Sequence, residues 1–264
     1  MKGCCAVFLI LKKIRKIPKV ILNILKNMKA FVSSQNEIKK LKNKYKDQRC
    51  FIIGNGPSLR VEDLEKIKQE KSFSSHRIYK IFDSTNWRPD FYCVQDYQLV
   101  MASENAISKM AECSKAMIGR FFRLSYPRFK GFLSFRINNK KFYPDLPLFS
   151  EDVSKCIYQG MTVSYMCLQL AIYMGFKEIY LLGIDHSYSV TLNENGSVQH
   201  HNGVKDHFSD EDDIANVPVL YMSTLSYVAA KKYAEKHGVK IYNATRGGSL
   251  DVFERVDFDS ISFL

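Results

Sequence analysis

Two glycines and a serine follow a short apolar run near residue 50 in a pattern that suits phosphate binding. Residues 50–53 read as a buried strand, and they lead directly into Gly54-Asn55-Gly56-Pro57-Ser58. The glycines permit unusual backbone angles and let a ligand approach the main chain. Pro57 and Ser58 suit the first turn of a helix, whose free N–H groups attract an anion. We therefore predict a nucleotide-binding turn, with a ligand-free strand-to-helix turn as the alternative.

The spacing of this turn argues against two common nucleotide sites. It matches neither the G-x-G-x-x-G fingerprint of dinucleotide binding nor the G-x-x-x-x-G-K-[ST] loop of nucleotide hydrolases. NAD and ordinary P-loop hydrolysis are therefore both disfavoured.

A second candidate site lies at the end of another predicted strand, residues 177–184, which is followed by Asp185 and His186. In open parallel sheets, ligands bind at the carboxyl ends of the strands. An apolar helix is predicted just upstream over residues 162–174, with Thr162 as an acceptable N-cap. Asp185 and His186 are therefore candidate site residues.

The segment that follows, residues 186–217, has no sustained periodicity. It holds four of the six histidines of the chain: His186, His200, His201 and His207. A loop of this length inside a compact domain is more often a lid or a binding segment than a plain connector. A lone loop histidine is usually exposed and inert, but this concentration favours a chemical role.

Several charged residues could bind a metal or an anion. Asp83, Asp96 and Asp185 end or follow predicted strands and could hold Mg²⁺ with a triphosphate, while Asp96 could equally bond sugar or ribose hydroxyls. Arg246, followed by two glycines, suits a carboxylate or phosphate, with an ordinary surface turn as the alternative. The seven cysteines form no C-x-x-C pair, so neither a zinc site nor a disulfide framework is indicated.

The net charge of +12 lies entirely in the first 49 residues. That segment holds 14 Lys and Arg against Glu37 and Asp47, which leaves 25 basic and 25 acidic residues in positions 50–264. A body that binds nucleic acid is expected to spread basic residues over its own surface, so nucleic acid is not an expected partner.

Residues 1–48 are predicted to form a basic amphipathic helical arm. Isoleucines and leucines alternate with lysines between residues 12 and 31, as in a helix that lies on an anionic membrane surface. The alternative is a solvated helix that packs one apolar face on its own domain. The opening apolar run is too short to span a bilayer, and free cysteines fit a reducing compartment. We therefore expect a cytoplasmic protein that is peripheral on the inner face of the cell membrane.

The rest of the chain alternates predicted strands and helices. The predicted strands include residues 77–83, 90–95, 116–119 and 239–243, and a long helix is predicted over residues 220–237, ending at Gly238. This alternation predicts an α/β class, a Rossmann-like doubly wound mainly parallel sheet. A break is predicted at residues 33–36, and a nucleotide-sugar-binding domain is predicted over residues 49–264, with a lid over about 186–217.

Several strings of this sequence resemble known families. The Gly54–Ser58 turn, the segment Gly160-Met161-Thr162-Val163-Ser164 and the string Gly183-Ile184-Asp185 resemble the bacterial sialyltransferases of lipooligosaccharide synthesis. A closer resemblance is to a broad family named for an archaeal 6-hydroxymethylpterin diphosphokinase, often met in surface-polysaccharide pathways. It rests on the strings Thr85-Asn86-Trp87-Arg88-Pro89-Asp90-Phe91-Tyr92, Met174-Gly175-Phe176-Lys177-Glu178-Ile179-Tyr180 and Tyr242-Asn243-Ala244-Thr245-Arg246-Gly247-Gly248.

The resemblance implies roles for particular residues. It implies that the donor nucleotide contacts the turn over Gly54, Asn55, Gly56, Pro57 and Ser58, and that Thr162, Val163 and Ser164 lie beside its phosphate. The related proteins usually have an asparagine, which can bind the edge of a nucleobase, at the position of His76. The sialyltransferases take a base from the segment after the Gly-Ile-Asp strand, where His207 is the best candidate, although the local alignment places Glu211 there. The base or phosphate partner thus comes from the set His186, Tyr188, His207 and Glu211.

These features together predict a glycosyltransferase similar to the sialyltransferases, which transfers a nonulosonate from a CMP-sugar to a glycan or glycolipid acceptor with inversion. No cofactor is required in this interpretation, and Mg²⁺ stays an option. Self-association into a homo-oligomer also stays open. The alternatives are a 6-hydroxymethylpterin diphosphokinase that uses ATP and Mg²⁺, and a non-catalytic nucleotide-sugar-binding scaffold.

Overall fold

The structure, a computed structural model, describes residues 29, 31–112, 115–120, 131–208 and 217–263. The strands are β1 (Arg49–Ile53), β2 (Ser72–Ser75), β3 (Phe91–Val94), β4 (Lys115–Arg120), β5 (Leu133–Asn138), β6 (Ile157–Tyr158), β7 (Glu178–Leu182), β8 (Val190–Leu192), β9 (Val198–His200), β10 (Lys240–Asn243) and β11 (Glu254–Arg255). The helices are α3 (Val61–Lys66), α4 (Tyr97–Ala102), α5 (Glu104–Ser108), α6 (Val163–Tyr173) and α7 (Leu220–Lys236), with 3₁₀ turns η1 (His76–Ile81), η2 (Lys109–Glu112) and η3 (Phe258–Ser260).

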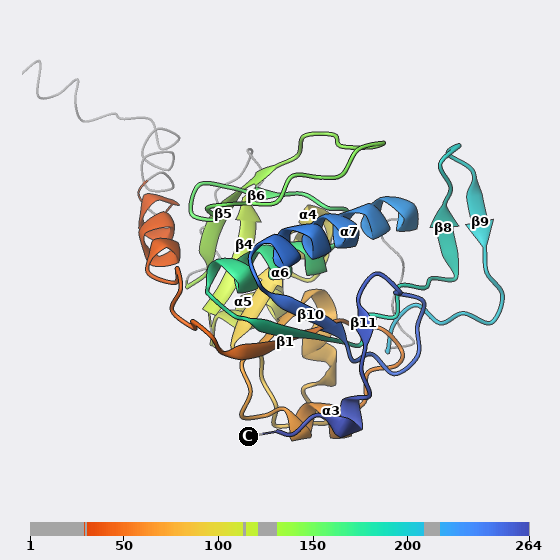
Figure 1. The fold of residues 1–264 in the computed structure, drawn as a ribbon, viewed down its shortest axis with the longest axis horizontal. Coiled ribbons are helices and arrows are strands. Elements are labelled where there is room, and N and C mark those ends of the chain that lie inside the picture. The colour runs from red at the N-terminus through yellow and green to blue at the C-terminus, as the bar shows by residue number, and fades with distance from the viewer. Residues whose placement is uncertain (1–28, 30, 113–114, 121–130, 209–216, 264) are drawn as a thin grey trace, which may run out of the picture.

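Nine of these strands form one sheet, in the order β11-β10-β7-β1-β2-β3-β4-β5-β6. Each neighbouring pair in it is parallel. The predicted α/β class with a mainly parallel, doubly wound sheet is therefore confirmed. The antiparallel hairpin of β8 and β9 lies outside this sheet and projects away from it (Figure 1).

The central strand β1 shows why the sheet is covered on both faces. Its side chains alternate between two cores: Cys50 and Ile52 join the cluster that includes α6, while Phe51 and Ile53 join the cluster beneath α3. A strand buried on both faces reads as a continuous apolar run, as residues 50–53 do. Helix α6 packs across β1, β2 and β3, and α7 lies beside it over β10 (Figure 1).

The strand order reverses direction at β1. From β1 the chain builds outward through β2 to β6, then returns to place β7 and β10 on the other side of β1. The loops after β1 and β7 therefore leave the sheet side by side, at the position where open α/β sheets bind ligands.

The prediction of a strand over residues 77–83 is wrong. The strand is instead the serine-rich β2, in which the Ser74 hydroxyl donates to the carbonyl of Ile53 on β1 (3.1 Å). His76 then takes a positive φ of 50°, which turns the chain out of the sheet into η1. Ile78 and Ile81, three residues apart, both face the core from that 3₁₀ turn.

The described end of the basic arm is part of the domain core. Residues 31–39 are helical and run through the predicted break at residues 33–36, so that prediction is wrong. Ile38 and Leu41 are buried, and the Tyr45 ring stacks on Phe176 with centroids 5.0 Å apart. For this part of the arm, the alternative of a helix that packs on its own domain is therefore correct. Residues 1–28 lie outside the described residues, and no described helix is long and apolar enough to cross a membrane.

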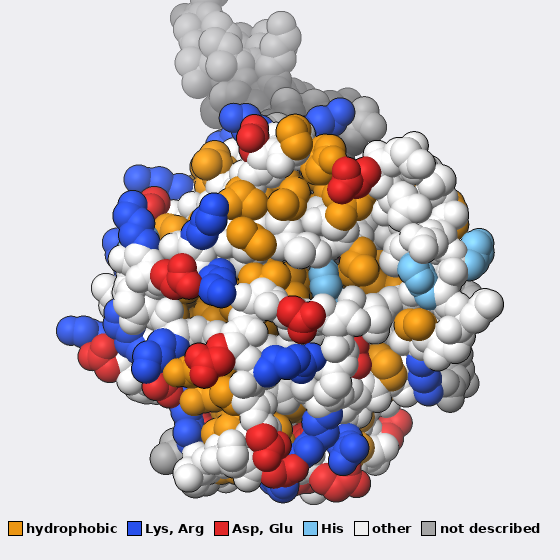
Figure 2. All heavy atoms as spheres, turned by 45° about the vertical axis from the view of Figure 1, so that its right-hand side comes forward, with side chains coloured by type: hydrophobic (Ala, Val, Ile, Leu, Met, Phe, Trp, Pro, Cys, Tyr) orange, Lys and Arg blue, Asp and Glu red, His pale blue; other side chains and the backbone are white. Residues whose placement is uncertain are grey.

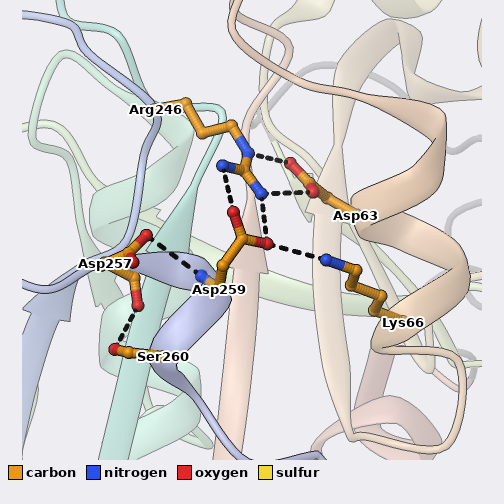
Figure 3. Close-up of polar contacts among 6 residues, drawn as sticks. All are labelled: Asp63, Lys66, Arg246, Asp257, Asp259 and Ser260. Atoms are coloured by element: carbon orange, nitrogen blue, oxygen red, sulfur yellow. Dashed lines mark hydrogen bonds and ion pairs between the residues drawn. The ribbon is translucent and has the colours of Figure 1, made fainter.

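Arg246 joins three separate parts of the chain (Figure 3). Its guanidinium donates two hydrogen bonds to the buried Asp63 carboxylate on α3 (2.8 and 2.9 Å) and two to Asp259 in η3 (both 2.8 Å). Lys66 adds a further hydrogen bond to Asp259 (2.7 Å). The hydrogen bonds from Arg246 and Lys66 hold the pKa of Asp259 below its ordinary value. The cluster therefore fastens the C-terminal segment to the first helix of the domain.

We expect Arg246→Met to lower the free energy of unfolding by about 3 kcal/mol, because it leaves the Asp63 carboxylate buried without a partner. Urea denaturation measures this loss. Lys40→Met is the matched control, since it breaks an ion pair to Glu37 whose side chains are 70% and 41% exposed, and such pairs contribute about 0.2–1 kcal/mol. Equal losses in the two variants would show that the Arg246 cluster does not hold the fold.

Candidate functional site

A cavity of about 650 Å³ lies where the loops after β1 and β7 diverge. Its walls come from these two loops, from the ends of β2 and β3, from the start of α6, and from the segment that leads into α7. This volume suits a small-molecule ligand. The cavity brings together these predicted site residues: Gly54, Asn55, Gly56, His76, Asp96, Thr162, Val163, Ser164, Asp185, His186, Tyr188 and His207.

Other predicted site residues lie elsewhere. Pro57 and Ser58 do not line the cavity, and they do not begin a helix as predicted, because α3 starts at Val61. The Ser58 hydroxyl instead donates to the Asp185 carboxylate (2.8 Å). Arg246 also lies outside the cavity, and its guanidinium is held by two carboxylates, which gives it a structural role. Glu211 lies outside the described residues.

The glycine turn packs directly on the loop after β7. The amides of Gly54 and Gly56 donate to the carbonyls of Leu182 (2.8 Å) and Gly183 (2.9 Å). A Cβ on Gly54 would lie 2.2 Å from the Gly183 oxygen, and one on Gly56 would lie 1.8 Å from an Asp185 oxygen. The glycines thus allow two loops to touch, and the N–H groups of both bind protein rather than a phosphate.

Two buried polar atoms at the cavity wall have no partner within the described protein: Oδ1 of Asn55 and Nε2 of His76. The Asn55 amide nitrogen donates to the Ser75 carbonyl (3.1 Å), which fixes the orientation of the amide. Burial lowers the pKa of His76 to about 4, so its imidazole is neutral at physiological pH. A buried polar atom without a partner costs about 1–3 kcal/mol, so this pair indicates a ligand that supplies the missing hydrogen bonds.

Asp185 is held in place by two segments of the chain, the glycine turn and the residues after β10. Besides Ser58, the amide of Ser249 donates to its carbonyl (2.7 Å), and Gly248 packs against its backbone. The adjacent amide of Ile184 donates to the Thr245 hydroxyl (3.1 Å). Burial raises the pKa of the Asp185 carboxyl group. The residues after β10 thus hold the loop after β7 in place. The sequence analysis did not predict this role.

The described part of the predicted lid crosses the glycine turn. The Asp206 carboxylate accepts a hydrogen bond from the Ser189 hydroxyl (2.7 Å), and the amide of Phe208 donates to the Asn55 carbonyl (3.0 Å). His207, between these two anchors, lines the cavity with its ring 6.5 Å from that of Tyr188. This segment therefore lies against the glycine turn.

The opposite wall is formed by the start of α6 and by α7. The Thr162 hydroxyl accepts from the Ser164 amide (3.3 Å), which confirms the predicted N-cap. The N-terminal end of a helix favours negative charge. Tyr227 of α7 lies next to Thr162, with the two hydroxyls 3.5 Å apart. No local pattern marks Tyr227 as a site residue, because only the packing of α7 on α6 brings it to the cavity.

Only two of the three predicted Mg²⁺ ligands lie at the cavity. Asp96 and Asp185 line the cavity and Asp83 does not. One oxygen of Asp96 caps α4, accepting hydrogen bonds from the amides of Gln98 (2.8 Å) and Leu99 (3.2 Å). Within the described ranges, no three His, Cys, Asp or Glu side chains are grouped closely enough to hold a metal ion.

Two half-buried histidines, His76 and His186, predict a loss of stability in acid. Burial lowers the pKa of both His76 and His186 to about 4, whereas the unfolded chain takes up these protons near pH 6.5. Between these values the unfolded state binds more protons, so stability falls as the pH is lowered from about 6.5 to about 4. We expect a slope on the order of 1 kcal/mol per pH unit for each histidine.

Urea denaturation at a series of pH values tests this prediction. The double variant His76→Gln and His186→Gln should lose most of the slope between pH 6.5 and 4, whereas His237→Gln, which changes an exposed histidine, should retain it. If the double variant retains the slope of unfolding free energy against pH, groups other than His76 and His186 cause it.

Comparison with known proteins supports the fold and identifies the family. The structure of the MAf glycosyltransferase from Magnetospirillum magneticum AMB-1 is similar, with a TM-score of 0.53 and 16% sequence identity. The match covers 84% of this chain and 36% of that chain, so this protein spans little more than a third of that enzyme. Among curated protein sequences, none matches this chain significantly.

A sequence model of one family covers most of the part of the chain that forms the cavity. It is described as 6-hydroxymethylpterin diphosphokinase MptE-like, and it matches residues 22–191, more than half of the chain. The matched segment includes the glycine turn, the start of α6 and the Asp185–His186 pair. This protein belongs to the MptE-like family.

Proposed function

We propose that this protein is a glycosyltransferase that transfers a nonulosonate such as sialic acid from a CMP-sugar to a glycan acceptor, in cell-surface polysaccharide or lipooligosaccharide synthesis. The observation that carries the proposal is the pair of unpartnered atoms, Asn55 Oδ1 and His76 Nε2, at the wall of a cavity at the sheet's switch point. The similarity of the fold to a glycosyltransferase agrees with it.

The two atoms offer what a cytosine edge requires. Cytosine carries an exocyclic amino group beside acceptor atoms on its ring. Asn55 Oδ1 accepts a hydrogen bond from that amino group, and the neutral imidazole of His76 donates through Nε2 to a ring acceptor. In this arrangement the hydroxyls of Tyr188 and Ser164, with the N-terminal end of α6, receive the leaving phosphate. Metal is then an option rather than a requirement.

The proposed reaction is a single displacement. The acceptor hydroxyl attacks the anomeric carbon from the face opposite CMP, a new carbon–oxygen bond forms, and the bond to the phosphate oxygen breaks. The proton of the hydroxyl passes to His207, and CMP leaves with the bonding electrons, which inverts the anomeric configuration. His207 is suited to this role because its segment crosses the glycine turn. Glu211 is the other candidate, on the family resemblance alone.

We expect CMP and CTP to raise the melting temperature without added metal. A ligand at 100 times its Kd adds about 2.7 kcal/mol, which corresponds to roughly 5–10 °C for a domain of this size. A thermal-shift panel of CMP, CDP, UDP, GDP and ATP, with and without Mg²⁺, measures this.

His76→Phe should abolish the CMP shift, because it removes Nε2 from the cavity wall. Trp87→Phe is the matched control, since it also removes a buried unpartnered nitrogen, but one outside the cavity. If His76→Phe still responds to CMP as the unmodified protein does, the base-binding assignment is wrong.

Replacing the base should slow turnover without weakening donor binding. A positioned general base contributes about 10²–10⁴-fold in rate, so we expect His207→Ala to lower turnover on that scale and to keep the CMP thermal shift. Glu211→Gln is the companion variant. Normal turnover in His207→Ala with loss in Glu211→Gln would make the carboxylate the base, and full activity in both would place the base elsewhere.

The second candidate function is a 6-hydroxymethylpterin diphosphokinase that uses ATP and Mg²⁺, which the description of the family favours. Asp96 and Asp185 would then bind the metal. Stabilisation by ATP with Mg²⁺ alone in the thermal-shift panel would favour this function. The third option, a non-catalytic scaffold, is favoured if none of the loop histidines or Glu211 approaches the turn, whereas His186 and His207 line the same cavity as Gly54 and Gly56.

We also propose that the basic arm holds the enzyme on an anionic membrane, on the inner face of the cell membrane, close to a membrane-borne acceptor. Acidic and basic side chains are interspersed over the face of the body that Figure 2 shows, so this face offers no continuous basic surface to an anionic membrane. The truncation that tests the arm must spare Ile38, Leu41 and Tyr45, which pack in the core, and must remove only residues 1–28.

The truncated protein beginning at Lys29 should lose most of its binding to anionic vesicles. The seven Lys and Arg residues removed contribute about 1 kcal/mol each near an anionic surface. Sedimentation with vesicles measures the loss, and binding by the full chain should weaken as salt is raised. A version with these seven residues changed to Gln is the control for charge alone. Undiminished sedimentation of the truncated protein would show that the arm is not the anchor.

A further inference from the structure

His186 is tied to α7 by a chain of two hydrogen bonds. Its Nε2 atom lies 2.8 Å from the hydroxyl oxygen of Thr224, and that hydroxyl donates to the carbonyl of Leu220 (3.0 Å). His186 lines the cavity, whereas Thr224 and Leu220 lie behind it on α7. The chain of bonds thus runs from the cavity wall to the helix backbone.

The chemistry of this chain determines which ring nitrogen carries the proton. A threonine hydroxyl has one hydrogen, and here it is directed to a carbonyl, which can only accept. The Thr224 oxygen must therefore accept from His186, so Nε2 bears the hydrogen. In a neutral imidazole the other nitrogen, Nδ1, then carries a lone pair. Burial lowers the pKa of His186 to about 4, which keeps the ring neutral at physiological pH.

The ring is also held in one orientation. It packs edge-to-face on Tyr227, with centroids 5.4 Å apart and an angle of 81°. The backbone of His186 has a positive φ of 53°, and the preceding Asp185 is anchored by Ser58 and Ser249. With Nε2 engaged by Thr224, Nδ1 is the ring nitrogen that is available to a ligand.

We infer that Thr224 is a positioning residue that holds His186 as the Nε2-protonated tautomer, so that Nδ1 accepts a hydrogen bond from a ligand hydroxyl. A lone pair at Nδ1 attracts an O–H group and repels phosphate oxygens, so this wall of the cavity binds a sugar hydroxyl and not the leaving phosphate. The identification of that hydroxyl as part of a sugar rests on the proposed function. The tautomer itself does not.

The low pKa of His186 also limits the role of this residue in the reaction. A base with a pKa near 4 removes a proton from a hydroxyl poorly at neutral pH. His186 therefore orients a hydroxyl, which leaves the proton transfer to another group.

Nitrogen-15 NMR of the imidazole rings in the full chain tests the inference, because it distinguishes protonated from bare ring nitrogens. The signals of His186 are assigned by their loss in His186→Gln, against those of the other five histidines. We expect a protonated Nε2 and a bare Nδ1 in the unmodified protein and in Thr224→Ser, which retains the hydroxyl. In Thr224→Val, which has nearly the same shape, we expect the Nε2-protonated signal to give way to the other tautomer or to a mixture.

A protonated Nδ1 in the unmodified protein, or an unchanged tautomer in Thr224→Val, would overturn the inference. If Thr224→Val does not fold, the unmodified protein and Thr224→Ser still decide it. Inorganic phosphate is the probe for the ligand class: we expect its addition to leave both ring nitrogens of His186 unchanged. Protonation of Nδ1 on adding phosphate would make His186 a phosphate partner. These outcomes are independent of transferase activity, so the inference and the proposed function can fail separately.

Discussion

The close contact between the loops after β1 and β7 is the constraint on which the site depends. Gly54 and Gly56 place their backbone against Gly183 and Asp185, at a separation that leaves no room for a Cβ. Two amide-to-carbonyl bonds across this contact extend the pairing of β1 with β7 beyond the end of the sheet. One wall of the cavity is therefore the backbone of these two loops, held in close contact at the switch point of the sheet.

This contact changes what the glycine turn can do. Because both glycine amides bind the neighbouring loop, the turn contributes a ligand contact mainly through the side chain of Asn55. The other side chains that can contact a ligand come from the surrounding elements, among them His76 at the start of η1 and Thr162 at the start of α6. The site is thus built by tertiary packing around the contact between the loops after β1 and β7.

The cavity also carries a cost in stability that points to function. Asn55 and His76 each bury a polar atom without a partner, and His76 and His186 adopt positive φ angles that favour glycine. Native proteins tolerate such local conflicts mainly at sites where a ligand compensates for them. Structural bracing from outside the cavity keeps these features in place: Thr245 and Ser249 hold the loop after β7, and the Arg246 cluster fastens the segment that carries them.

Local patterns in the sequence determined the architecture. The apolar run of β1, the Thr162 cap and the end of α7 before Gly238, which has a positive φ of 63°, each depend on neighbouring residues, and each was predicted correctly. The sequence also directed attention to the edge of the sheet where the cavity lies, since the carboxyl ends of parallel strands meet at one edge.

Only the tertiary structure decided which residues meet. The serine-rich β2 has no local strand signal and is a strand because its backbone pairs with β1 on one side and β3 on the other. From the sequence, Arg246 was a candidate anion-binding residue. In the structure its guanidinium binds Asp63, which lies 183 residues earlier in the chain, and Asp259, which lies 13 residues later. The hydrogen bond between His186 and Thr224 spans 38 positions. Charge and hydrogen-bonding capacity are properties of single residues, whereas the partner that occupies them depends on the packing of distant elements, which no local pattern encodes.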